Sequence, residues 1–291
     1  MGFPAPQGER RLPPHFTARL RAAAVDQAAA VPARDAATVV LLRDGTNGPE
    51  VYLLRRVTSM AFAAGMHVFP GGSVDPRDES LPAACWAGPP AEAWAPVLTA
   101  PPPLARSLVC AAVRETFEET GVLLAGRRPV DGKPMDVLDD VSDESWEADR
   151  AALLDRSESL AGMLARRQLQ LRADLLRPWS HWITPEIEPR RYDTRFFLAA
   201  LPGGQRTRDV GGEADAVAWL RPTVALAAAT AGEVGLLPPT AVTLAELSDY
   251  PSVAAVLTAA ATRDVRPVLP RIVLRGDDAV VLLPGEPGYD A

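Results

Sequence analysis

Short apolar runs rich in β-branched residues alternate with clusters of turn residues along much of the chain. Residues 37–42 and 51–54 are two such runs, and the segment 44–49 between them is dense in glycine, asparagine and proline. Because these residues favour tight turns, the pattern predicts a β-hairpin. Further strands are predicted at residues 182–184, 192–201, 216–220, 271–274 and 280–283.

Apolar positions at helical spacing appear between these strands. Residues 104–120 carry one apolar face, and Gly121 follows where helices commonly end. Residues 144–176 repeat leucine and methionine at near-helical spacing, with a break near Ser157 at which two helices could divide. Shorter helices are predicted at residues 222–231, 240–247 and 253–262. Interleaved strands and helices predict an α/β fold class, with a mixed sheet covered by helices on both faces.

Two segments interrupt this pattern, and we expect both to be insertions in a single domain spanning residues 1–291. Residues 79–103 contain seven prolines, so they cannot form a long regular element. Two tryptophans in this segment need packing partners, which favours an ordered excursion over the site rather than a mobile loop. Residues 139–178 are predicted to form a helical insertion, acting as a lid or as the contact surface of a homodimer.

Composition limits the classes of partner. The chain has 291 residues, 47% of them apolar, and a formal charge of −7, so it predicts a globular protein with no nucleic acid partner. Two cysteines exclude a disulfide framework. No apolar run approaches the roughly 20 residues of a membrane span, and the last three residues are not a peroxisomal tripeptide. We therefore expect no membrane partner and a cytoplasmic location.

Three carboxylates gather near the end of the helix predicted at 104–120. Glu115, Glu118 and Glu119 stand at i, i+3 and i+4, which places them on one side of the helix. Like charges at these spacings cost about 0.2–0.5 kcal/mol per pair, a cost that a bound cation would offset. Because hard divalent cations prefer oxygen ligands, the cluster indicates a metal site.

At these residues the sequence resembles the Nudix hydrolase family, whose signature is G-x5-E-x7-R-E-U-x-E-E-x-G-U, with U an aliphatic residue. Gly72 matches the first glycine and residues 114–122 match the second half, except that Thr116 replaces an aliphatic residue. Asp78 stands where the early glutamate is expected, and 35 residues rather than seven separate it from Arg114. The motif is thus split by about 28 residues. This split resembles the peroxisomal-type coenzyme A diphosphatases of animals and their bacterial relatives, as does the text at residues 65–72 and 191–198.

The resemblance implies an α/β/α sandwich and a site that uses Mg²⁺ or Mn²⁺. Glu115, Glu118, Glu119 and the backbone carbonyl of Gly71 would hold the metal. Glu213 or Glu115 would serve as general base, and Glu213 could instead be a further ligand. Arg114 orients the carboxylates in the family by pairing with the early glutamate, and Asp78 is the nearest chemical substitute for that partner.

The implied substrate is a nucleoside diphosphate derivative, most simply coenzyme A or an acyl-coenzyme A. Arginines beside the predicted strands are candidates to bind its phosphates, because the guanidinium fork suits phosphate oxygens. These are Arg55, Arg56, Arg191 and Arg195. Two alternatives stay open: an ADP-ribose or NADH diphosphatase, and a non-catalytic module that binds a nucleotide and regulates a partner.

Overall fold

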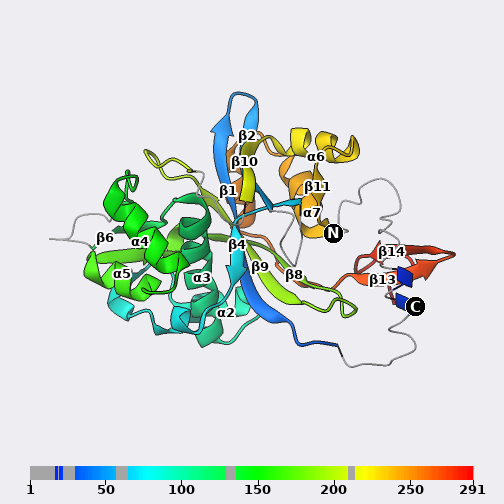
Figure 1. Cartoon of the computed structure of the whole chain (residues 1–291), viewed down its shortest axis with the longest axis horizontal. Coiled ribbons are helices and arrows are strands. Elements are labelled where there is room, and N and C mark those ends of the chain that lie inside the picture. The colour runs from blue at the N-terminus through cyan, green and yellow to red at the C-terminus, as the bar shows by residue number, and fades with distance from the viewer. Residues whose placement is uncertain are drawn as a thin grey trace.

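A mixed sheet runs through the centre of the computed structural model, which describes residues 17–18, 20–21, 30–56, 65–128, 136–208 and 214–290 (Figure 1). Within those ranges the sheet has nine strands, in the order β11-β3-β2-β1-β9-β8-β12, with β4 paired to β1 and β10 paired to β2. The strands are β1 (Arg34–Gly45), β2 (Gly48–Arg56), β3 (Met66–Val68), β4 (Gly71–Ser73), β8 (Arg177–Ile183), β9 (Tyr192–Ala200), β10 (Ala214–Leu220), β11 (Gly235–Leu236) and β12 (Pro267–Val268). The predicted hairpin at residues 37–54 is confirmed as β1 and β2.

Strand β1 lies at the middle of the sheet and is buried on both faces. It pairs in parallel with β9 and antiparallel with β2 and β4. Val39 and Leu41 pack into one hydrophobic core, whereas Val40 and Leu42 pack into the other. A strand covered on both sides has no need for polar residues at alternate positions, which explains the continuous apolar run of the sequence.

Helices cover the two faces of the sheet. One face carries α2 (Ala91–Leu98), α3 (Pro102–Thr120), α4 (Glu144–Leu154) and α5 (Leu160–Arg166). The other carries α6 (Pro222–Thr230), α7 (Pro238–Leu247) and α8 (Val253–Ala260), whose apolar residues join the second core. Figure 1 shows α3, α4 and α5 on one side of the central strands and α6 and α7 on the other. The predicted α/β/α arrangement is confirmed.

The helix predicted across residues 144–176 is wrong beyond Arg166. Residues 169–172 form β7 (Leu169–Arg172), which lies between β5 (Trp86–Ala87) and β6 (Ala125–Arg127) in a small separate sheet. Leu169 and Leu171 are buried while Gln170 and Arg172 are only partly so, which is the alternation of a half-buried strand. Two leucines two residues apart are compatible with either pattern, and only the burial of alternate residues identifies the strand. The predicted break near Ser157 is confirmed, because α4 ends at Leu154 and α5 begins at Leu160.

The proline-rich segment folds as a series of short elements. These are the 3-10 helices η1 (Pro76–Ser80) and η2 (Ala83–Cys85), followed by β5 and α2. Trp94 of α2 is buried and meets Phe197 of β9 edge-on, with ring centroids 6.0 Å apart. Arg106, near the start of α3, donates to the carbonyl of Leu81. The segment therefore packs on the first half of α3 and on β9, and its start at η1 is the part that reaches the glutamates.

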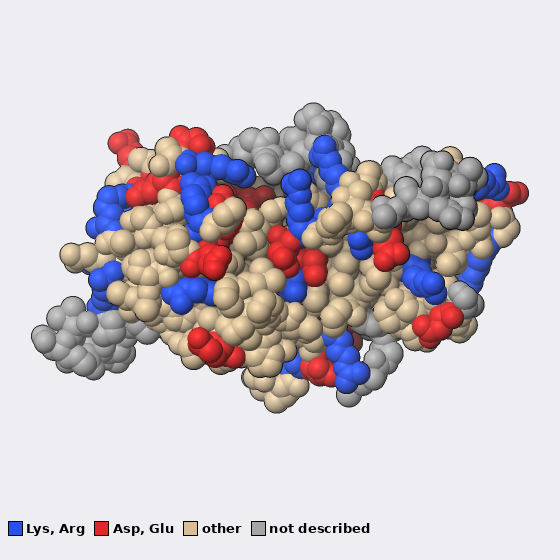
Figure 2. All heavy atoms as spheres, turned by 90° about the horizontal axis from the view of Figure 1, so that it is seen from below, with Lys and Arg blue, Asp and Glu red and all other residues tan. Residues whose placement is uncertain are grey.

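The rest of the chain carries a hairpin and a mixed surface. Strands β13 (Arg271–Arg275) and β14 (Asp278–Leu282) form the hairpin predicted near the C-terminus. Acidic and basic side chains are interspersed over the face seen in Figure 2. Within the described ranges, we find no helix with the length and apolar character that a bilayer crossing requires.

Candidate active site

Helix α3 presents the three glutamates at its C-terminal end. Gly121 ends the helix in the left-handed conformation, with φ of 70°, and its N–H donates to the Phe117 carbonyl at 2.9 Å. That ending confirms the prediction from sequence. Thr116 is fully buried, and its hydroxyl donates to the Ala112 carbonyl at 2.7 Å. The threonine therefore occupies an aliphatic position of the signature without leaving its polar atom unsatisfied.

Strand β4 faces α3 with its free backbone groups. The bonds from Val39 N–H to the Pro70 carbonyl and from Val74 N–H to the Asp35 carbonyl, at 2.8 and 2.9 Å, set the antiparallel ladder with β1. The backbone groups of Gly71 and Ser73 then point away from β1. Gly71 N–H donates to Glu119 Oε2 at 2.8 Å, and the Ser73 carbonyl accepts from Arg114 Nη2 at 2.9 Å. Because N–H and C=O of one strand residue point to the same side, the Gly71 carbonyl also faces α3.

The two glycines of β4 lie very close to neighbouring atoms. A Cβ added at Gly71 would lie 2.5 Å from the Ala37 carbonyl oxygen, and one added at Gly72 would lie 2.5 Å from Glu115 Oε1. The obstacle at Gly71 is backbone of β1, which cannot easily move. The obstacle at Gly72 is the end of the flexible Glu115 side chain, which can move away.

We therefore expect Gly71→Ala and Gly72→Ala to fail in different ways. Gly71→Ala should lower the free energy of unfolding by about 1–3 kcal/mol because β4 must separate from β1. Gly72→Ala should leave stability nearly unchanged, yet weaken Mn²⁺ binding about 10- to 100-fold because Glu115 is displaced. Urea denaturation and isothermal titration calorimetry would measure the two effects. Gly203→Ala is the control, since a Cβ there meets nothing within 4 Å; equal effects at all three glycines would contradict the prediction.

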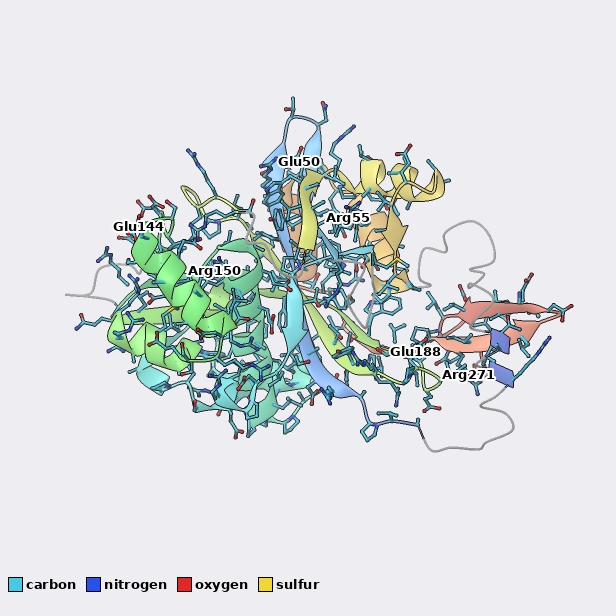
Figure 3. The ribbon with its side chains drawn as sticks, viewed as in Figure 1. Glu50, Arg55, Glu144, Arg150, Glu188 and Arg271 are labelled. Atoms are coloured by element: carbon cyan, nitrogen blue, oxygen red, sulfur yellow. The ribbon has the colours of Figure 1, made fainter. Side chains whose placement is uncertain are left out.

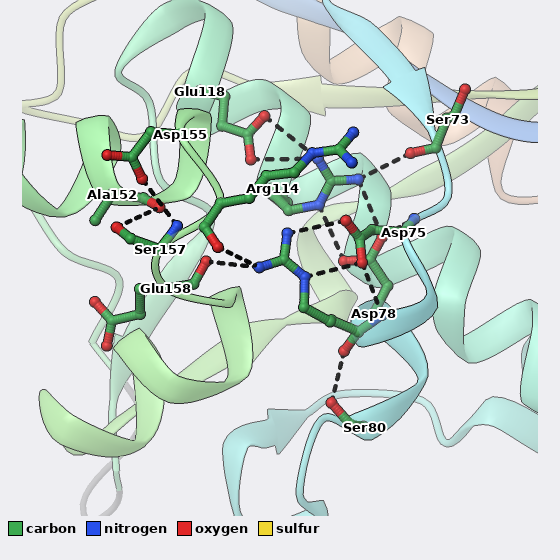
Figure 4. A network of polar contacts seen from close by, with 12 residues as sticks. Ser73, Asp75, Asp78, Ser80, Arg114, Glu118, Ala152, Asp155, Ser157 and Glu158 are labelled. Atoms are coloured by element: carbon green, nitrogen blue, oxygen red, sulfur yellow. Dashed lines mark hydrogen bonds and ion pairs between the residues drawn. The ribbon is translucent and has the colours of Figure 1, made fainter.

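Arg114 connects the glutamates to the first half of the split motif (Figure 4). Its Nε and Nη2 each donate to one oxygen of Asp78 at 3.0 Å, a bidentate ion pair. Its Nη1 donates to Glu115 Oε1 at 2.8 Å and to Glu118 Oε1 at 3.2 Å. Asp78 is 4% exposed and also accepts from the N–H of Asp75, which caps η1. Asp78 is thus confirmed as the partner of Arg114, although one side-chain carbon shorter than glutamate.

Burial shapes the electrostatics of these groups. Burial raises the pKa of Glu115 to about 7, although the charge of Arg114 opposes the rise. Burial also raises the pKa of Glu118. Burial opposes protonation of Arg114, but its hydrogen bonds to Asp78 and the charge of Glu115 hold its pKa above the ordinary value. The site therefore contains more negative charge than Arg114 alone stabilises.

The raised pKa of Glu115 predicts how the stability of the metal-free protein depends on pH. The folded state keeps this proton up to about pH 7, whereas an unfolded glutamate loses it near 4.5. The contribution of Glu115 to the free energy of unfolding is fully present below pH 4.5 and is lost as the pH rises through 7. Between pH 5 and 8, the free energy of unfolding of the Glu115→Gln variant should fall by about 1–3 kcal/mol less than that of the wild type. Urea denaturation in EDTA would measure both. Parallel profiles for the wild type and the variant would contradict the prediction.

The donor set suits a hard divalent cation. In the part of the chain that the structure describes, no three acidic, histidine or cysteine side chains form a cage that could hold a metal ion by themselves. Mg²⁺ seldom needs such a cage, because it usually binds one or two carboxylates and completes its shell with waters and substrate phosphates. Glu115, Glu118, Glu119 and the Gly71 carbonyl supply oxygen only, and Glu115 lies in a space that a Cβ at Gly72 would fill. These residues fit the metal that the sequence predicts.

The predicted phosphate-binding arginines lie in different surroundings. Arg195 is 3% exposed, donates to the Leu98 carbonyl and pairs with Asp35 at 2.9 Å, so it holds β9 to its neighbours. Arg191 donates to the Thr184 and Val31 carbonyls and likewise has a structural role. Arg55 and Arg56 end β2, where they pair with β10. Figure 3 shows Arg55 on the central strands. Of the four, Arg55 and Arg56 stay candidates for substrate binding.

Glu213 lies outside the described residues, but the chain on both sides of it is described. Arg208 N–H donates to the Thr120 carbonyl at 2.9 Å, and its side chain donates to the Gly121 carbonyl at 3.2 Å. The chain therefore passes the C-terminal end of α3 at residue 208, and it resumes at Ala214, paired with Arg56 of β2. A role for Glu213 as base or ligand stays a prediction.

Two arginines that sequence reasoning missed secure α3 near the glutamates. Arg150 of α4 donates to the Glu118 carbonyl at 3.1 Å, and Figure 3 shows it between α4 and α3. Arg208 pairs with Glu147 of α4 at 2.8 Å while it binds the end of α3. Neither belongs to a local motif, because each acts across a distance in sequence that only the fold closes.

Comparisons with known proteins agree with this geometry. A family model described as the NUDT19 Nudix domain matches residues 97–247. The chain is 30% identical over 281 residues to the acyl-coenzyme A diphosphatase NUDT19 of Gallus gallus, covering 82% of this chain and 72% of that protein. It is 28% identical over 308 residues to the Homo sapiens protein of the same name, covering 92% and 80%. A crystal structure of a NUDIX hydrolase from Alicyclobacillus acidocaldarius superposes with a TM-score of 0.66 and 30% identity, covering 81% of this chain and 99% of that one.

Proposed function

This chain belongs to the Nudix hydrolase family and is an enzyme that cleaves diphosphate linkages, and we propose that it hydrolyses coenzyme A or an acyl-coenzyme A with Mg²⁺ or Mn²⁺. The observation that carries the proposal is that the fold brings the two halves of the split motif together. Asp78 and Arg114, 36 positions apart, form a bidentate ion pair beside the three glutamates of α3. Relatives named as acyl-coenzyme A diphosphatases support the choice of substrate.

Different residues of the site would have different roles in hydrolysis. Glu115, Glu118, Glu119 and the Gly71 carbonyl would hold the metal, which would neutralise the diphosphate and activate water. Arg114 fixes the carboxylates of Glu115 and Glu118, while Asp78 fixes Arg114. Glu115 or Glu213 accepts the proton of the attacking water.

The reaction breaks one P–O bond of the diphosphate and forms one from water. Oxygen from water is added to one phosphorus atom, and the bridging oxygen leaves with the other. With coenzyme A the products are phosphopantetheine and adenosine 3′,5′-bisphosphate. With an acyl derivative the acyl group stays on the phosphopantetheine.

A hydrolysis panel tests this proposal. Purified protein is incubated with coenzyme A, acyl-coenzyme A, ADP-ribose, NADH and nucleoside triphosphates, each with Mg²⁺ and with Mn²⁺, and products are separated by chromatography. The highest kcat/KM is expected for coenzyme A or its acyl derivative. A preference for ADP-ribose or NADH would replace the proposed substrate while leaving the diphosphatase chemistry intact.

The oligomeric state and the location of the chain stay predictions. A homodimer formed through α4 and α5 would place two copies of the 139–178 segment together, and sedimentation velocity would detect it. A cytoplasmic location is expected from the low cysteine content. Fluorescence microscopy of the tagged full chain would check it.

A further inference from the structure

Arg156 lies in the turn between α4 and α5, and that turn is fastened to the first half of the split motif. Its carbonyl accepts from Arg77 Nη1 at 3.0 Å, and the Glu158 carbonyl accepts from the same atom at 3.3 Å. Arg77 in turn donates to both oxygens of Asp75, at 3.0 and 2.9 Å. Figure 4 shows Asp155, Ser157 and Glu158 in the same network of polar contacts as Asp75, Asp78 and Glu118. The turn is therefore held at the edge of the active site.

The side chain of Arg156 is exposed, and its charge reaches Glu118. Burial raises the pKa of Glu118, while the positive charges of Arg114 and Arg156 act in the opposite direction. The other arginines of these helices are paired: Arg150 with Glu147, and Arg166 and Arg167 with Asp149. Within the ranges that the structure describes, the Arg156 guanidinium makes no hydrogen bond or ion pair. It is therefore an exposed cation at the edge of the site, with hydrogen-bond donors available to a substrate.

The backbone at this position would favour another residue. Arg156 has φ of 64°, in the left-handed region. Glycine adopts this conformation without strain and asparagine tolerates it, whereas other side chains make it unfavourable. The sequence therefore places an arginine where the backbone conformation alone would favour glycine. The guanidinium is the group that arginine supplies and glycine lacks.

We propose that Arg156 binds the diphosphate of the substrate, so that the helical insertion contributes a substrate-binding residue to the site. The proposal rests on the proposed function. The guanidinium fork can donate two hydrogen bonds to phosphate oxygens, and Arg77 holds the turn that carries it against Asp75, at the edge of the site that the glutamates of α3 form. The contacts through Arg77 hold the turn in place, so the side chain reaches the substrate without a large rearrangement.

The substitution Arg156→Gly tests the proposal without straining the fold. Hydrogen bonds to charged groups contribute enough that kcat/KM for coenzyme A is expected to fall about 10- to 100-fold, mainly through KM. The melting temperature should stay level or rise, because glycine suits the backbone. Arg156→Lys should recover part of the loss, since it keeps the charge but not the fork. Arg127→Ala, which removes an exposed arginine of β6, should match the wild type.

Binding measurements separate this proposal from the choice of substrate. Isothermal titration of ADP with Mg²⁺ should show about 10-fold weaker binding to Arg156→Gly than to the wild type, whichever compound the enzyme hydrolyses best. If the wild type turned over only ADP-ribose or NADH, the proposed substrate would fail while the Arg156 comparison would be made on that compound. Wild-type KM and ADP affinity in Arg156→Gly would overturn the role of Arg156. A fall in activity that simply followed a fall in melting temperature would do the same.

Discussion

Glu119→Gln is expected to lower kcat for the preferred diphosphate substrate by about three orders of magnitude. Glu119 is one of the three carboxylates proposed to hold the metal, and the electrostatic stabilisation that a metal ion gives a transition state is several kcal/mol. A loss of about 4 kcal/mol corresponds to about a thousandfold in rate. Glutamine keeps the shape of the side chain and can still accept the hydrogen bond from Gly71 N–H, now made at 2.8 Å. Stopped assays with Mg²⁺ and Mn²⁺ would measure the change.

The control for this variant is Glu144→Gln. Glu144 is exposed at the start of α4, and Figure 3 shows it at the outer end of that helix. It should retain wild-type kcat, and both variants should show the wild-type melting temperature without metal. A Glu119→Gln enzyme with undiminished kcat would remove Glu119 from the metal site.

Asp78→Ala is expected to lower the free energy of unfolding by about 3–5 kcal/mol, the cost of breaking a buried ion pair by removing one of its two members. The carboxylate makes two 3.0 Å bonds to Arg114 and accepts the N–H of Asp75, so its loss affects both the ion pair and the cap of η1. Arg114 would also lose the contact that directs it toward Glu115 and Glu118. Activity should therefore fall together with stability. Urea denaturation followed by circular dichroism would give the first quantity.

The neighbouring residue offers a matched control. Glu79 is exposed one position further along η1, and Glu79→Ala should change stability by no more than about 0.5 kcal/mol. Asp78→Glu should recover part of the stability, because it restores a carboxylate that can reach Arg114. Equal denaturation midpoints for Asp78→Ala and Glu79→Ala would show that the ion pair contributes little.

Local pattern determined much of the fold and part of the site. The apolar run of β1, the turn that follows it and the ending of α3 at Gly121 depend on neighbours within a few residues. The side that Glu115, Glu118 and Glu119 share follows from helical spacing alone. The prediction of a helix at β7 is wrong for the opposite reason. This four-residue strand forms because it pairs with β5 and β6, which are distant in sequence.

Tertiary structure alone decided which charged groups act together. Arg195 resembles a phosphate-binding residue in sequence, yet the parallel register of β1 and β9 places it opposite Ala37, and it is buried. Asp78, the early acid of the split motif, meets Arg114 because η1 packs against α3. Arg156 lies at the edge of the site because Arg77 binds the turn after α4. Periodicity records the preferences of neighbours a few residues apart. Contacts between side chains tens of residues apart depend on how the helices and insertions pack, which no local pattern encodes.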